Sequence, residues 1–220
     1  MMRSVRRTVT RLTGAALLTG CAVGAAHAHP HVFVTTKAAI VFNSQGEVTA
    51  IKQSWTFDDM YSSFVLQGLA DAGKTASREV LAPLAKSNVD SLAELGYYTL
   101  SKMAGKELEY GTPTDAAMEE NPDKTVTLYY TLPLKEPASA KKSFSVKVYD
   151  PTFFVDFEVT KGNDAVTLIN APKGCSASVI RPGPLMANET QELAMAKSEN
   201  FALDAAFSIK LASQLVVACP

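Results

Sequence analysis

The sequence predicts an α+β fold, built mainly from antiparallel sheet with about nine strands and three helical regions. Two observations carry this prediction. Segments that alternate apolar and polar residues, as half-buried strands do, follow one another without intervening helices. Segments with apolar residues at helical spacing form separate runs, whereas a parallel α/β fold would alternate strand and helix. We therefore expect a single domain over residues 29–220.

The first part of the chain has clear strand and helix patterns. Residues 32–42 and 47–57 are rich in Val, Ile, Phe and Thr, and residues 43–46 between them have turn composition. These segments predict a hairpin. Apolar residues then recur at helical spacing over 60–72 and 75–95, which predicts the first two helical regions.

The second part predicts short strands, a third helical region and a closing strand. Residues 112–123 are polar and contain two prolines, so we expect a loop there. The third helical region is expected at 189–211, and residues 214–219 are rich in β-forming side chains. The other expected strands are 97–103, 107–110, 125–134, 144–148, 153–159, 165–170 and 175–180.

Residues 1–28 have the composition of a signal peptide. Four arginines and no acidic residue precede an apolar stretch at 12–26, and Ala26-His27-Ala28 fits the small-x-small cleavage rule. We predict cleavage after Ala28 and export to the periplasm. A lipoprotein box at Leu18-Thr19-Gly20-Cys21 is the alternative, which would anchor the chain through a lipid on Cys21. The apolar stretch at 12–26 is short for a membrane span. We also expect no membrane span in the mature chain.

The charge of the mature chain argues against nucleic acid as a partner. Removing the four leader arginines lowers the formal net charge from −1 to −5. Arg78 and Arg181 are then the only arginines in the mature chain. Nucleic-acid binding calls for a clustered basic face. An acidic protein instead concentrates cations near its surface.

Two cysteines, Cys175 and Cys219, remain after either processing route. An even pair in an oxidising compartment most simply forms a disulfide. Two buried free thiols are the alternative.

The only mature histidines are His29 and His31, at the predicted new amino terminus. Residues i and i+2 of an extended strand point to the same side, so both imidazoles can reach one ion. The free amine of His29 adds a third nitrogen donor, and nitrogen donors favour zinc, nickel or copper over calcium or magnesium. Pro30 has no N–H, which excludes the square-planar copper/nickel chelate that needs the second backbone amide. The alternative is an exposed terminus that binds nothing.

A tetrahedral site needs a fourth ligand, and the chain offers carboxylates near its predicted strand ends. The candidates are Asp58, Asp59, Asp150 and Asp156. Asp58 and Asp59 end the strand that pairs with the first one, which favours them if the hairpin is long. Each aspartate also has a structural interpretation, since Asp58 or Asp59 can cap the next helix and Asp150 can stabilise a turn.

No catalytic constellation emerges from the sequence. Any general-base histidine would have to be His29 or His31, and no glycine-rich phosphate loop is present. We therefore expect a protein that is not an enzyme.

Three segments resemble one bacterial exported family of unknown function, whose members are labelled uncharacterised ABC-type transport system, periplasmic component. They are the opening His29-Pro30-His31-Val32-Phe33-Val34, the block Trp55-x-Phe57-Asp58 with Met60-Tyr61, and the block from Tyr149 to Phe157. The two mature cysteines also match. The resemblance implies metal handling, because genes of the family often lie beside divalent-cation transporters of the nickel/cobalt type.

Together these features predict a periplasmic metal-binding accessory protein. The expected ion is zinc or nickel/cobalt, with copper as a further candidate, and the expected partner is a membrane-embedded divalent-cation transporter. The chain is shorter than a two-lobed solute-binding protein and lacks its βαβ alternation, so a clamshell receptor is not expected. A metal-free module for protein interaction or envelope assembly is the alternative function.

Overall fold

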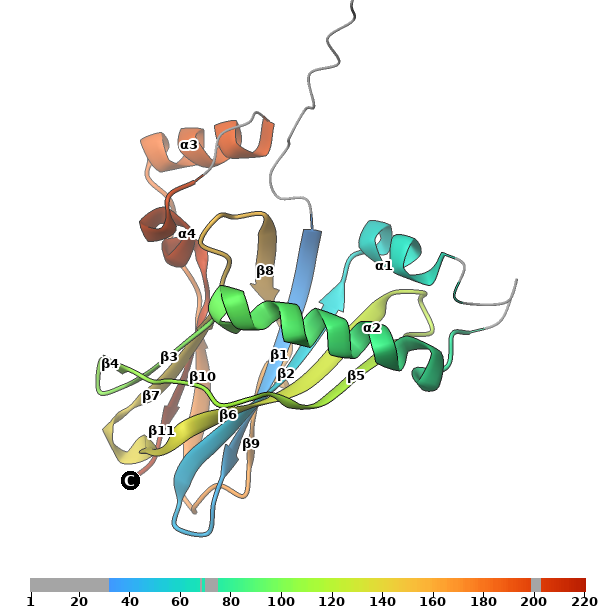
Figure 1. The fold of residues 1–220 in the computed structure, drawn as a ribbon. Coiled ribbons are helices and arrows are strands. Elements are labelled where there is room, and N and C mark those ends of the chain that lie inside the picture. The colour runs from blue at the N-terminus through green and yellow to red at the C-terminus, as the bar shows by residue number, and fades with distance from the viewer. Residues whose placement is uncertain (1–31, 68, 70–74, 199–202) are drawn as a thin grey trace, which may run out of the picture.

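The computed structural model describes residues 32–67, 69, 75–198 and 203–220. The predicted signal peptide, Cys21, His29 and His31 lie outside these residues. The described residues form two sheets, four α-helices and two short 3₁₀ segments (Figure 1). The α+β class and the mainly antiparallel pairing are confirmed.

The first sheet has six strands, and three of them pair with β1 (Val32–Phe42). One edge of β1 pairs antiparallel with β2 (Glu47–Phe57) over nearly its whole length. The other edge pairs in parallel with β8 (Val155–Val159) along its first half and with β9 (Val166–Ile169) along its second half. The sheet continues beyond β2 with β6 (Val126–Ser139) and then β5 (Thr114–Glu120).

The second sheet has five strands, and every neighbouring pair in it is antiparallel. Its order is β10 (Ser176–Ile180), β11 (Gln214–Ala218), β7 (Phe144–Val148), β3 (Thr99–Met103) and β4 (Lys106–Glu107).

The described helical elements are four α-helices and two short 3₁₀ segments. The bounds are α1 (Asp59–Leu66), α2 (Arg78–Ser91), η1 (Leu92–Tyr98), η2 (Ala140–Lys142), α3 (Ala187–Ser198) and α4 (Ala205–Leu211). In Figure 1, α2 crosses the first sheet, while α1 and α3 lie at the end of the molecule where β1 begins. No helix in the described part of the chain is long and apolar enough to cross a membrane.

The inward side chains of β1 contribute to two of the three apolar cores. Val34 packs with Trp55 and with the buried face of α2, whereas Ile40 and Phe42 pack between the two sheets. A third, smaller core gathers around Phe153 and joins α3 and α4 to the rest of the domain. Burial of the alternate residues of β1 therefore fixes its register, because a slip of one residue would expose the whole apolar set.

Several predicted elements are confirmed and several are wrong. The hairpin of β1 and β2 has the predicted bounds, and β3, β7, β10 and β11 lie where the sequence placed them. The described strands number eleven, and the one that was not expected is β5, because residues 114–120 of the expected loop pair with β6. The third helical region is two helices, α3 and α4, since Asp204 starts a new helix by accepting the N–H of Phe207 at 2.7 Å.

The predicted disulfide is confirmed. Cys175 and Cys219 are bonded at an S–S distance of 2.02 Å across a separation of 44 residues. The bond joins the start of β10 to the end of β11, which are neighbours in the second sheet.

Removing this bond should lower the stability of the domain. We expect the double change C175S/C219S to reduce the free energy of unfolding by about 3–4 kcal/mol, because the closed loop restricts the unfolded chain. Denaturant unfolding followed by circular dichroism measures the loss. The wild-type chain in reductant should unfold like the double variant, and equal midpoints for the oxidised wild type and the variant would contradict this expectation.

Candidate functional site

The start of β1 is tied to the end of β2 by two reciprocal hydrogen bonds. The N–H of Asp58 donates to the carbonyl of Phe33 at 3.0 Å, and the N–H of Phe33 donates to Asp58 Oδ2 at 2.8 Å. Asp58 Oδ1 accepts the N–H of Tyr61 at 2.8 Å, which makes Asp58 the N-cap of α1. One carboxylate therefore joins β1 and α1, and its capping role is confirmed.

Asp59 lies in the first turn of α1 and its side chain is exposed. A carboxylate there favours the helix because the amino-terminal end carries a partial positive charge. Nothing in the described structure holds Asp59 toward β1.

Asp156 lies on the other side of β1. In the parallel pairing of β1 with β8, Asp156 is opposite Phe33, and Glu158 is opposite Thr35. Among the described residues, none donates a hydrogen bond to the half-buried carboxylate of Asp156. Burial raises the pKa of Asp156, the charge of Lys197 on α3 lowers it, and the charge of Glu158 raises it.

Asp58, Asp156 and Glu158 line one groove at the start of β1. The groove has a volume of about 270 Å³, and its other lining residues include Phe33, Thr35, Thr56 and Thr125. The structure thus brings Asp58 and Asp156 to the two sides of the same short piece of strand. That piece begins at Val32, the residue that follows His31 in the sequence.

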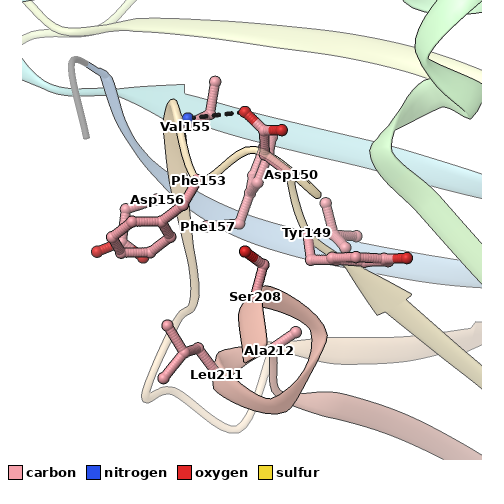
Figure 2. Close-up of a pocket in the computed structure, with 10 residues that line it drawn as sticks. Tyr149, Asp150, Phe153, Val155, Asp156, Phe157, Ser208, Leu211 and Ala212 are labelled. Carbon is pink, nitrogen blue, oxygen red and sulfur yellow. Dashed lines mark hydrogen bonds between the residues drawn. The ribbon is translucent and has the colours of Figure 1, made fainter. Parts of the chain in front are cut away.

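Asp150 is not part of this groove and stabilises a turn. Its side chain is 3% exposed and accepts three hydrogen bonds, from the N–H and the hydroxyl of Thr152 at 2.8 Å each and from the N–H of Val155 at 3.0 Å. Figure 2 shows the bond to Val155, with Ser208 of α4 on the other side of the small cavity. The predicted turn role of Asp150 is confirmed.

The turn that Asp150 holds places β8 beside β1. Phe153 has a left-handed backbone with φ of 57° and packs into the core formed by α3 and α4. The carbonyl of Phe154 then accepts the N–H of Val32 at 3.4 Å, where the parallel pairing begins. The segment from Tyr149 to Phe157 therefore fixes the position of Asp156 relative to β1.

The metal ligands predicted from the sequence lie only partly within the described structure. In the described ranges, no three His, Cys, Asp or Glu side chains lie close enough together to hold a metal ion. The two histidines of the prediction are outside those ranges. Of the four aspartates, the groove brings Asp58 and Asp156 together, while Asp59 and Asp150 serve a helix start and a turn.

Fold and groove define a two-sheet α+β protein with carboxylates on both sides of its first strand. The chain matches the family model described as "Protein of unknown function (DUF1007)" over residues 14–219 and belongs to that family. No curated protein matches the chain.

Replacing Asp150 should destabilise the domain. Asp150→Asn turns one accepting oxygen into a donor that faces an N–H or a hydroxyl, so we expect a loss of about 1–3 kcal/mol in the free energy of unfolding. Denaturant unfolding measures the loss, with Asp59→Asn as the exposed control. A midpoint for Asp150→Asn as high as that of the control would show that the turn does not depend on this carboxylate.

Replacing Asp156 should have the opposite effect on the metal-free protein. Because the folded state raises the pKa of Asp156, its charged form is disfavoured by folding. Above the folded-state pKa, Asp156→Asn should therefore stabilise the protein.

The pH dependence of this effect has a definite sign. The gain should shrink as the pH falls through the raised folded-state pKa and vanish below the ordinary aspartate pKa of about 3.9, where both states are neutral. Thermal unfolding of both variants from pH 3 to pH 8 measures it. A gain that is constant over this range would contradict the assigned cause.

Proposed function

We propose that this protein is a periplasmic accessory protein that binds one divalent transition-metal ion and serves a metal transport system. In this proposal the amine and imidazole of His29, the imidazole of His31 and the carboxylate of Asp156 hold the ion. Asp58 is the second carboxylate within the same groove. The role is binding and delivery, with no catalytic step.

The placement of Asp156 is the observation that supports the proposal most. Its carboxylate is half-buried and accepts no hydrogen bond from a described residue, and the charge of Lys197 on α3 favours its ionised form only against the cost of burial. It lies opposite Phe33, the second residue after His31 in the sequence. A cation bound at the start of β1 would compensate this charge.

The other carboxylates fit the role of ligand less well. Both oxygens of Asp58 already accept backbone N–H groups, so an ion would compete with the link between β1 and α1. The carboxylate of Asp150 accepts three hydrogen bonds inside its turn. Asp59 is exposed on α1 and is the natural control residue.

The proposed donor set selects a class of ion. One amine, two imidazoles and one carboxylate give three nitrogens and one oxygen, which suits zinc in tetrahedral geometry and also nickel or cobalt. Copper is a further candidate. The absence of an N–H at Pro30 disfavours a square-planar complex with the backbone.

The proposed periplasmic location and the proposed transporter partner are supported by the sequence alone. The basic and apolar segments of residues 1–28 and the cleavage motif at Ala28 support a periplasmic location, and a lipid on Cys21 would anchor the protein instead. The family resemblance supports a membrane-embedded divalent-cation transporter as the partner. A free amine on His29 requires cleavage after Ala28.

The decisive test is metal titration of a chain that begins at His29. Calorimetry with zinc, nickel, cobalt and copper should show one site per chain. His31→Ala and Asp156→Asn should each weaken binding by at least about tenfold, as expected for loss of a ligand. Asp59→Asn should bind like the wild type.

Affinity should also fall as the pH drops below about 6.5, because the imidazoles must be neutral to bind a metal. Equal binding by His31→Ala and the wild type would refute the proposal. Absence of binding by the wild type would leave the metal-free interaction module as the better function. Binding lost in His31→Ala but unchanged in Asp156→Asn would keep the metal site and remove Asp156 from it.

A further inference from the structure

The end of the molecule where β1 begins carries an exposed apolar rim, which we define as Phe33, Met60, Phe64 and Phe154. Their exposed fractions are 47%, 69%, 75% and 43%. Large apolar side chains that are this exposed at one end of a domain mark an interaction site. From them we propose that this end of the protein docks on the surface of a lipid bilayer.

Hydrogen bonds tie the segments that carry the rim residues to one place. Phe154 precedes β8 and its carbonyl accepts the N–H of Val32, the first residue of β1. Phe33 follows Val32 and is hydrogen-bonded to Asp58, the cap of the helix that carries Met60 and Phe64. The four side chains therefore come from three segments that meet at the start of β1, at the end where Figure 1 places α1.

The outward position of Met60 and Phe64 is fixed by the other face of α1. Ser62 is fully buried, and its hydroxyl accepts the N–H of Val126 at 2.9 Å and donates to the carbonyl of Phe57 at 3.3 Å. Val65 is buried in the core beneath α2. Since residues four apart lie on one side of a helix, Met60 and Phe64 project together away from that core.

The form of the rim favours a bilayer over a protein groove or a second copy. Apolar side chains that project from a short helix insert readily into the interface between headgroups and acyl chains. The groove at the start of β1 mixes Phe33, Val34 and Phe57 with threonines and carboxylates, so it is not a purely apolar socket for a second Phe64. Asp58, Asp59, Asp156 and Glu158 lie nearby, so neutral headgroups fit this end better than anionic ones.

The upstream chain joins the domain at the same end. Residues 1–31 lead into Val32, and a lipid on Cys21, the alternative processing route, would be separated from Val32 by ten residues. Ten extended residues span at most about 35 Å, so such an anchor would hold this end next to the membrane. The rim does not depend on the proposed metal, and metal-free protein should dock.

Vesicle co-sedimentation tests the proposal. The chain of residues 29–220 contains every described strand and helix and excludes the apolar leader. We expect it to sediment with vesicles of neutral phosphatidylcholine, and less with vesicles containing anionic phosphatidylserine. The double change M60S/F64S should lower the partition coefficient by at least about tenfold.

The control is Ile180→Ser, which replaces a side chain that is 56% exposed on β10 of the other sheet. It should partition like the wild type, and circular dichroism should show all three chains folded. No sedimentation of the wild type with neutral vesicles would overturn the proposal, as would equal partitioning by M60S/F64S. Vesicle-independent dimerisation lost in M60S/F64S would assign the rim to a second copy instead.

Discussion

The two-way link between Phe33 and Asp58 is the interaction on which the candidate site depends. This link joins the start of β1 to the end of β2, its hairpin partner. The carboxylate of Asp58 also caps the first turn of α1. A carboxylate that accepts two backbone N–H groups binds both segments more strongly than a neutral cap would. The geometry at the start of β1 is therefore set by the carboxylate of Asp58 together with its backbone partners.

The second side of the site depends on a buried turn. Asp150 satisfies its carboxylate within that turn, and Phe153 anchors the turn to α3 and α4. The result is that β8 runs parallel to β1 and brings Asp156 opposite Phe33. Among the described residues, several donate hydrogen bonds to Asp58 and Asp150, whereas none donates to Asp156, and this contrast is why the proposed site uses Asp156.

Local patterns predicted the parts of the fold that local interactions determine. The β-forming composition of residues 32–42 and 47–57 and the turn between them predicted the hairpin, and the capping role of Asp58 followed from its position before a helix. Residues 114–120 contain three acidic side chains and little alternation, so only their pairing with β6 makes them a strand. The parallel contact of β1 with β8 joins residues more than 120 positions apart, and no local pattern predicts it. Asp204, an N-cap residue inside the third helical region, was a local signal for the break between α3 and α4.

The coordination of the bound ion tests the central claim most directly. X-ray absorption at the zinc edge, on the chain beginning at His29 with one equivalent of zinc, reports the ligand atoms and their distances. We predict four nitrogen and oxygen ligands at about 2.0–2.1 Å with scattering from two imidazoles, and one oxygen fewer from protein in Asp156→Asn. A spectrum without imidazole scattering, or one that is unchanged by both His31→Ala and Asp156→Asn, would contradict a metal site at the start of β1.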